Sequence, residues 1–403
     1  MALDLALRLW RHGYDAIPSA RGWPVGRDAF VTPLLGRRAL VVRGPEGARL
    51  FYDTDRVRRE KAAPAALSAL LFGRGAVHGL DGREHAERKA LMMRVLDPAR
   101  VDELVRRAGA DLDQAGHAWS AQDRVVLFDE LVRVYGGAVQ AWAGVGLPAG
   151  DADRLSRDLA RIVDGFGGAG AAYPRAWVAR RRTDRVLRAV LVDARDDRTS
   201  PPDGSPVRQL ADAVGSDLPL EVAAVELGNV LRPTVAVAWF GTFAALALSQ
   251  NPSWAPRMVS DEAVREAFAH EVRRFYPFVP ALAGRLTGGY VRGGVRLRRG
   301  DRVVLDVPGT DYDPRTYEHP EVFAPERFLG GLPGPFAFVP QGGGHPETGH
   351  RCPGERVTMG LLTETLRVLA GLDLTAPSDV RVDSGRVPTR PTDGLVLRVR
   401  SRQ

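Results

Sequence analysis

Apolar residues recur with the spacing of an amphipathic helix through most of residues 84–246. The same spacing predicts a short helix within residues 1–18 that Pro18 ends. It also predicts a helix over residues 261–275 and another over about 355–370. The hydrophobic pattern therefore indicates a mainly α-helical protein.

Short apolar runs separated by glycine turns have the pattern of β-strands. They predict strands and a turn over residues 38–52, short strands over 285–305, and a strand-like C-terminal segment. The polar, proline-rich segment 195–206 lies between helical patterns and predicts a surface loop, not a domain boundary. We expect one domain over residues 1–403, mainly α with small β-sheets.

The charge pattern narrows the choice of partners. The 403-residue chain has 56 basic and 49 acidic residues and a formal net charge of +7. Only Lys61 and Lys89 are lysines, so 54 of the basic residues are arginines, a bias that genome composition explains. The arginines are mixed with acidic residues, and the densest run, Arg180–Arg182, has no interleaved aromatic residues. This pattern disfavours nucleic-acid binding, while a basic protein still favours anionic ligands.

No stretch of the sequence predicts a membrane span or a disulfide. The longest nearly apolar run, residues 235–248, has 14 residues and is too short to cross a bilayer. The N-terminal segment lacks the basic start and apolar stretch of a signal peptide. Cys352 is the one cysteine, which fits a protein of the reducing cytoplasm. A lone cysteine is usually a buried residue without chemistry.

The neighbours of Cys352 distinguish it from such a residue. Three consecutive glycines, Gly342–Gly344, allow the backbone to approach a flat surface closely. Pro353 and Gly354 form a turn directly after the cysteine, and Glu355 begins a helix. Backbone amides and the helix dipole at that end favour the thiolate. A thiolate held in such a loop is suited to axial ligation of haem iron.

Two further motifs accompany the cysteine loop. Glu271 and Arg274 lie one helical turn apart and can pair, although such a pair on a surface contributes little. Downstream, Arg327 of a Pro-Glu-Arg-Phe motif can complete a charged network. In this order the three motifs resemble the cytochrome P450 superfamily. The resemblance implies the cytochrome P450 fold and haem b (iron protoporphyrin IX) ligated by the Cys352 thiolate.

The segment that corresponds to the long central helix of that superfamily departs from the common pattern. Oxygen-activating members usually carry an acidic residue followed by threonine there, whereas residues 227–237 carry Arg232 and Pro233. A buried arginine is costly unless it is paired, and a proline removes a hydrogen bond and kinks a helix. Arg232 is therefore either part of a structural salt bridge or the binding group for a carboxylate that the substrate brings.

The Arg-Pro pair resembles the fatty-acid peroxygenase family of cytochromes P450, and the likeness covers nearly the whole chain. The matching segments are Phe51–Asp55, Phe72–Gly73, Asp81–Gly82, His85–Lys89, Leu231–Pro233, Glu271–Pro277, Gly309–Pro314 and Pro340–Gly344. The resemblance implies that hydrogen peroxide replaces dioxygen, electrons and a reductase. It further implies that a long-chain fatty acid is hydroxylated at the α or β carbon. Its carboxylate, held by Arg232 beside Pro233, would supply the acid–base group that the protein lacks.

The resemblance also assigns residues around the reacting carbon. His78 falls on the distal side of the haem, where histidine occurs in members that decarboxylate fatty acids to terminal alkenes. We expect hydroxylation to dominate, with alkene as a competing product. Phe72, Val163 and Phe166 match positions that line the acyl channel, and core packing is the alternative for each. Ala281 stands where relatives often have phenylalanine, which widens the pocket and leaves chain length and regiochemistry open.

The haem contacts are likewise implied by the resemblance. They are His85 and Arg88, with Arg59 and Arg285 as further candidates, near the propionates, and Gln341 and Gly342 in the cysteine loop.

Two other functions compete with the peroxygenase. The first is a dioxygen-dependent cytochrome P450 monooxygenase, which would require redox partners and which the missing acidic residue disfavours. The second is a haem or lipid carrier without catalysis, which would bind fatty acid and consume no peroxide. Turnover with peroxide alone distinguishes the peroxygenase from both.

Overall fold

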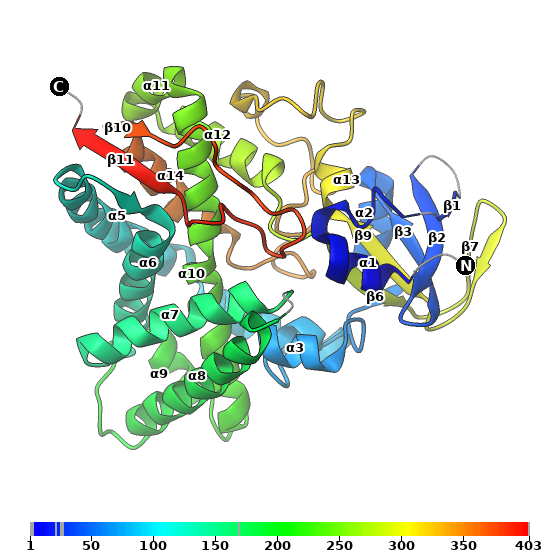
Figure 1. Cartoon of the computed structure of the whole chain (residues 1–403). Coiled ribbons are helices and arrows are strands. Elements are labelled where there is room, and N and C mark those ends of the chain that lie inside the picture. The colour runs from blue at the N-terminus through cyan, green and yellow to red at the C-terminus, as the bar shows by residue number, and fades with distance from the viewer. Residues whose placement is uncertain (1–3, 21, 25–27, 168–169, 402–403) are drawn as a thin grey trace.

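The structure, a computed structural model, describes residues 4–20, 22–24, 28–167 and 170–401 (Figure 1). Its α-helices are α1 (Leu5–His12), α2 (Gly44–Tyr52), α3 (Ala65–Leu71), α4 (Gly82–Val95), α5 (Pro98–Ser120), α6 (Leu127–Ala143), α7 (Ala149–Gly165), α8 (Ala172–Arg195), α9 (Pro206–Asp212), α10 (Leu220–Gln250), α11 (Ala255–Ser260), α12 (Glu262–Phe275), α13 (Val307–Asp311) and α14 (Glu355–Ala370). Its strands are β1 (Trp23–Pro24), β2 (Ala29–Leu34), β3 (Arg37–Val42), β4 (Val57–Arg58), β5 (Val125–Val126), β6 (Ala281–Leu286), β7 (Tyr290–Arg292), β8 (Val295–Leu297), β9 (Arg302–Asp306), β10 (Leu372–Thr375) and β11 (Val396–Ser401). The predicted mainly α fold with small sheets is confirmed.

The largest sheet has the strand order β1-β2-β3-β9-β6-β4. Its central pair, β3 and β9, is parallel, and the other pairs are antiparallel. Successive side chains of a strand point to opposite faces. Val41 and Val304 therefore pack with Leu5 of α1, whereas Leu40 and Val303 pack on the other face, in a cluster that includes side chains of α2. Figure 1 shows this sheet at one end of the molecule, beside α1.

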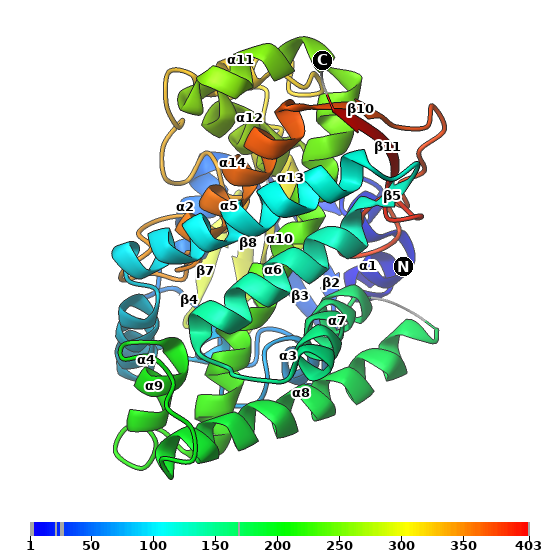
Figure 2. The same ribbon diagram turned by 90° about the vertical axis from the view of Figure 1, so that its left-hand side faces the viewer.

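The helix α10 runs through the helical part of the molecule and packs against α6, α7, α8 and α14 (Figure 2). It is 31 residues long and apolar enough by composition to cross a membrane. However, 94% of its most apolar window is buried inside the protein, as in the core helix of a globular fold. Its side chains belong to the largest hydrophobic cluster of the described residues, so α10 is the core on which the helical part is assembled.

Several boundaries predicted from the sequence are confirmed. The predicted helix over 261–275 is α12, where the Asp261 side chain accepts hydrogen bonds from the first free backbone amides. The predicted helix over 355–370 is α14. The proline-rich segment 195–206 connects α8 to α9. Within the described part of residues 1–18, the predicted N-terminal helix is α1.

Two local expectations are wrong. Residues 38–52 were expected as strands and a turn, but β3 ends at Val42 and residues 44–52 form the helix α2. Gly44 adopts a φ of 71°, Pro45 occupies the first turn, and the helix buries one apolar face against the sheet. Pro233 does not interrupt its helix either, because α10 continues through it. The close packing of the surrounding helices outweighs the one lost hydrogen bond.

Candidate active site

Cys352 lies in the loop that leads into α14. Its backbone N–H donates to Gln341 O over 3.0 Å, so the two ends of the loop are tied together. Gly342 adopts a φ of 101°, and a Cβ there would lie 2.9 Å from Tyr52 Oη and 3.1 Å from Arg351 Cα. Only glycine fits this position without strain. The glycine run therefore shapes the loop around the sulfur.

Burial, more than the helix end, sets the protonation of the free thiol. Desolvation raises the pKa of Cys352, against the opposing effects of the Gly354 amide, Lys89 and Gln341. The Gly354 amide lowers the pKa of the thiol, in the direction expected from the sequence, but burial outweighs this effect. A metal ion bound to the sulfur would favour its deprotonation.

Cations gather close to this loop. Arg59 donates through Nη2 to Phe51 O over 3.0 Å, while its Nη1 is buried without a hydrogen-bond partner among the described residues. Lys89 is buried and donates to Arg351 O over 2.6 Å, and burial lowers its pKa to about 8. The rings of His85 and His350 lie 4.1 Å apart.

These groups fit a haem with two propionates. Cys352, a free cysteine, would supply the axial ligand, and the glycines of the loop let Tyr52 and Phe336 pack closely against its backbone. The unpartnered Nη1 of Arg59 is a donor for a propionate oxygen. Lys89, which sequence analysis did not single out, lies near the same sulfur and adds positive charge there.

Arg232 is buried in α10, with 4% of its surface exposed. Its Nη1 donates to Asn229 Oδ1 over 2.9 Å and to Leu71 O. Among the described residues it forms no ion pair with a carboxylate, so the structural salt bridge considered above is absent. Burial lowers its pKa to about 9, and the group stays charged at neutral pH. Pro233, the next residue, is the one position from 223 to 248 of α10 that is not fully buried.

The sequence-predicted residues Phe72 and His78 lie beside Arg232. The rings of Phe72 and His78 stack with centroids 4.1 Å apart, and the Arg232 guanidinium lies 5.7 Å from the Phe72 centroid. His78 is exposed by surface area, although protein groups lie around its ring. Burial, then the charges of Arg232 and Lys89, lowers its pKa to about 3, which leaves the imidazole neutral at pH 7.

Glu226 connects these groups and was missed by sequence analysis. It is fully buried on α10, and its Oε1 accepts from Val77 N over 2.8 Å and from Arg88 Nη1 over 2.9 Å. Its Oε2 accepts from Asn229 Nδ2 over 3.0 Å. The Glu226 carboxylate therefore links three groups: Arg88 on α4, the turn that carries His78, and Asn229, the hydrogen-bond partner of Arg232. Its partners Val77 and Arg88 lie far away along the chain, so the sequence offers no local signal for it.

The remaining sequence-predicted residues are more scattered. The Arg88 guanidinium forms an ion pair with Glu226, away from the cysteine loop. Arg59 contacts Gly284 of β6. Arg285 is the next residue of the strand, so its side chain points to the opposite face, where it lines a separate basic pocket. Val163 is 1% exposed and packs in the main hydrophobic core, which agrees with the alternative that it is a core residue. Phe166 is half-buried at the end of α7, and Ala281 begins β6 beside the cluster that includes α1.

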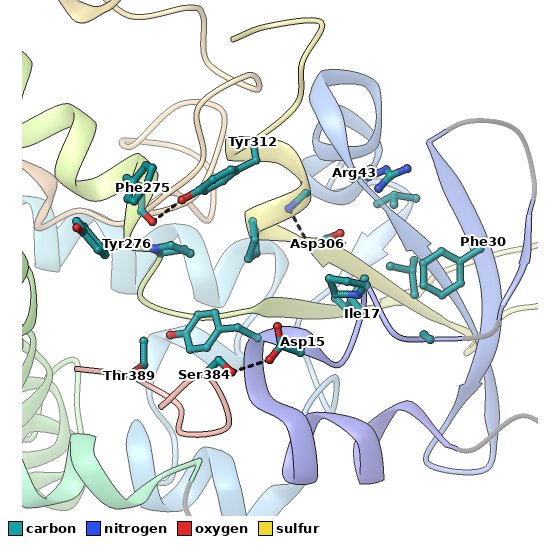
Figure 3. A pocket seen from close by; sticks show the side chains of 18 of the residues that line it. Asp15, Ile17, Phe30, Arg43, Phe275, Tyr276, Asp306, Tyr312, Ser384 and Thr389 are labelled. Atoms are coloured by element: carbon teal, nitrogen blue, oxygen red, sulfur yellow. Dashed lines mark hydrogen bonds between the residues drawn. The ribbon is translucent and has the colours of Figure 1, made fainter. Parts of the chain in front are cut away.

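A separate cavity of about 730 Å³ lies between η1 (Gly13–Asp15), the sheet and the C-terminal loop (Figure 3). Tyr276 and Tyr312 line it from one side, and Phe30 from the other. Ser384 donates to Asp15 across its edge. None of the predicted site residues lines this cavity, so it is not part of the cysteine site.

The charged network predicted from Glu271, Arg274 and Arg327 is confirmed, and it is buried. Glu271 accepts from Arg274 Nε over 2.6 Å and Nη2 over 2.7 Å, and Arg327 Nε lies 3.4 Å away. The Ala324 amide also donates to Glu271, over 2.7 Å. The network fixes the chain segment before the cysteine loop to α12.

Comparison with known proteins agrees with this geometry. The cytochrome P450 family profile matches residues 257–366. Cytochrome P450 137 of Mycobacterium tuberculosis is 27% identical over 339 residues, which are 75% of this chain and 67% of the relative. A variant of cytochrome P450SP alpha (CYP152B1) is 35% identical, with a TM-score of 0.92 and 99% of both chains covered. Ligand-free cytochrome P450 OleT is 31% identical, with a TM-score of 0.93, covering 100% of this chain and 98% of the other.

Likeness at this identity over nearly the full length shows the family. The chain belongs to the cytochrome P450 superfamily. Within it, the chain is an enzyme of the fatty-acid peroxygenase family, to which both solved relatives belong. Haem is the cofactor of the superfamily, and the peroxygenase function is favoured over the dioxygen-dependent alternative.

Proposed function

We propose that this protein uses hydrogen peroxide to hydroxylate long-chain fatty acids at the α or β carbon, in the cytoplasm and without a reductase. In this reaction a C–H bond becomes C–OH and the second peroxide oxygen leaves as water. The competing decarboxylation converts the acid and one peroxide into a terminal alkene, carbon dioxide and two waters. A variant of cytochrome P450 OleT has been solved with arachidonic acid and cytochrome P450SP alpha with (R)-ibuprofen, both of which are carboxylic acids.

The free edge of Arg232 is the observation that carries this proposal. Both hydrogen bonds of its guanidinium use Nη1, so Nε and Nη2 have no protein partner among the described residues. These two nitrogens form a fork that matches a carboxylate bidentately. A cation buried without a carboxylate partner favours a ligand that brings one. Pro233, the next residue of the chain, is half-buried.

The haem would be held by Cys352 on one face and by Arg59 at a propionate. When bound, it supplies the iron centre at which peroxide is cleaved and the C–H bond is oxidised. Gly342 and the backbone carbonyl of Gln341 keep the cysteine loop close to the haem face. The support for Arg88 and Arg285 at the propionates is weaker, because Arg88 pairs with Glu226 and Arg285 lines a separate basic pocket.

Proton transfer falls to the substrate carboxylate, because the neighbouring protein groups cannot supply it. His78 is neutral at pH 7 and Arg232 stays protonated, so neither is an acid–base group matched to neutral pH. His78 can still donate or accept a hydrogen bond as a neutral imidazole. The bound carboxylate holds the α and β carbons nearest to the reacting centre, which explains the proposed regiochemistry.

Turnover of Arg232 variants tests the proposal. The haem-loaded protein is given myristic acid and hydrogen peroxide without reductase, and products are identified by mass spectrometry. We expect hydroxy acid from the wild type and a loss of at least about a hundredfold in Arg232→Ala. Arg232→Lys serves as the matched control, since it keeps the charge and loses the fork. Equal turnover of wild type and Arg232→Ala would refute the assignment.

The product ratio tests the role of His78. We expect His78→Gln to lower the share of terminal alkene relative to hydroxy acid, because the glutamine cannot reproduce the imidazole contacts beside Phe72. An unchanged ratio would leave His78 as a packing residue only. Restoration of activity only by dioxygen, a reductase and an electron donor would favour the monooxygenase alternative.

A further inference from the structure

The positive charge of this protein is concentrated at one end of the large sheet. Four segments meet there: residues 4–12, 34–38, 56–61 and 285–302, here called the sheet-end surface. They carry 14 of the 56 basic residues, one of which, Arg59, belongs to the cysteine site, but only 3 of the 49 acidic residues, a net charge of +11. The other residues carry 42 basic and 46 acidic side chains, a net charge of −4. Arginine-rich composition alone would not separate the charges in this way.

Hydrogen bonds join the four segments into one surface. The Asp4 carboxylate accepts from Leu35 N over 3.0 Å, which links α1 to the turn between β2 and β3. Arg38 Nη1 donates to Arg296 O over 3.2 Å, which links that turn to β8. Arg302 Nη1 donates to Lys61 O over 2.6 Å, which links residues 285–302 to residues 56–61. In Figure 1 the labelled elements α1, β2, β6 and β7 lie together at this end of the molecule.

Large apolar side chains are also exposed on the sheet-end surface, on α1 and in two hairpins. Trp10 is 55% exposed and Leu7 is 38% exposed on α1, which is amphipathic. Leu35 at the turn between β2 and β3 is 45% exposed. Val291 in the hairpin of β7 and β8 is 61% exposed. Apolar side chains surrounded by arginines are typical of protein surfaces that contact the lipid–water interface.

A basic pocket of about 200 Å³ lies on this surface. Arg58, Lys61, Arg285 and Arg299 line it, and Glu60 is the one acidic residue among its lining residues. Burial lowers the pKa of Arg302, and the neighbouring positive charges of Arg285 and Arg37 lower it further. Like charges held this close favour binding of an anion between them.

We propose that the sheet-end surface docks the enzyme onto an anionic phospholipid surface. The arginines attract the negative headgroups, and the basic pocket accepts one headgroup phosphate. Trp10, Leu7, Leu35 and Val291 enter the interface, where an indole ring has its preferred environment. Nucleic acid is also anionic, but its phosphate backbone makes no favourable contact with exposed aliphatic side chains. The proposal rests on charge and exposure and does not depend on the reaction.

Vesicle flotation tests the proposal. The haem-loaded protein is mixed with vesicles of phosphatidylcholine alone or with about one third phosphatidylglycerol, at low and at high salt. We expect co-flotation with the anionic vesicles at low salt and release at high salt. Arg37→Glu combined with Arg296→Glu reverses two exposed charges. It should lower the partition coefficient at least about tenfold. Trp10→Gln should weaken the binding at low salt, although it leaves the charge of the surface unchanged.

A charge-matched variant separates docking from general attraction. Arg185→Glu combined with Arg188→Glu changes the net charge equally on two exposed residues of α8. This variant should float like the wild type, and thermal unfolding should show that all variants are folded. The proposal is overturned by an absence of flotation, or by equal losses in the two double variants. Tighter binding to a DNA duplex than to anionic vesicles would assign the surface to nucleic acid and overturn it as well.

Discussion

Arg232 Nη1 lies 2.9 Å from Asn229 Oδ1, and the two residues are one turn apart on α10. Asn229 Nδ2 in turn donates to Glu226 Oε2 over 3.0 Å. The amide of Asn229 is therefore fixed, with its oxygen toward the arginine and its nitrogen toward the glutamate. This relay holds Nη1 in place and leaves the other edge of the guanidinium without a protein partner among the described residues.

Removal of the amide should weaken fatty-acid binding. Asn229→Ala leaves Nη1 with only its bond to Leu71 O, so the fork is less firmly oriented, and loss of a hydrogen bond to a charged group costs about 1.5–3 kcal/mol. We expect the dissociation constant for myristic acid, measured by the spectral change on titration, to rise roughly ten- to a hundredfold. Thr242→Ala, which removes a hydroxyl bonded only within α10, is the control and should leave it unchanged. Equal affinities in the two variants would contradict the relay.

Glu226 should matter more for stability than any exposed carboxylate. Its removal in Glu226→Ala leaves Arg88, with a side chain 14% exposed, without its partner. The loss of one member of a buried ion pair costs about 3–5 kcal/mol. We expect the free energy of unfolding in urea to fall by about this amount. Glu87→Ala, which breaks the exposed pair with Arg83, should cost less than about 1 kcal/mol. Similar losses in both variants would show that Glu226 is not a structural hub.

The conformation of Gly342 predicts a defect in haem loading. Gly342→Ala places a Cβ against Tyr52 Oη and Arg351 Cα at a φ that L side chains rarely adopt. The cysteine loop must move, so we expect a lower ratio of haem to protein absorbance after purification. Gly330→Ala is the control, because a Cβ there meets nothing within 4 Å. Full haem occupancy in Gly342→Ala would contradict the proposed close approach.

Asp311 predicts a pH dependence of stability. It is fully buried, and burial raises the pKa of Asp311 from 3.8 to about 8, against the Val339 amide and the charges of Arg273 and Arg274. The folded state therefore keeps a proton that the unfolded chain releases. Its contribution to stability is complete below about pH 4 and is lost as the pH rises toward 8. Asp311→Asn should flatten the fall of the thermal midpoint between pH 5 and 8. Parallel curves for variant and wild type would refute this.

Local signals predicted the chemistry of the site well. The cysteine loop and α14 follow from glycine, proline and helix spacing within one short segment, and Arg232 was conspicuous as a charge in an apolar helix. Glu271, Arg274 and Arg327 were found because their motifs are local, although their burial was not foreseen.

Long-range partners could not be found in the same way. Glu226 joins Val77 and Arg88 across about 140 to 150 sequence positions, so no spacing along the chain reveals it. The same reason explains why Lys89, whose partner Arg351 lies 262 positions away, was passed over. The helix over residues 44–52 was missed because its short apolar runs fit a strand equally well, and only packing on the sheet decides between them.

The origin of the oxygen atom tests the central claim most directly. The haem-loaded enzyme is incubated with myristic acid and 18O-labelled hydrogen peroxide under argon, without reductase, and the hydroxy acid is analysed by mass spectrometry. The account predicts a hydroxy acid that carries one labelled oxygen, and almost no product from Arg232→Ala. A product that forms only with dioxygen and a reductase, or that carries unlabelled oxygen, would contradict it.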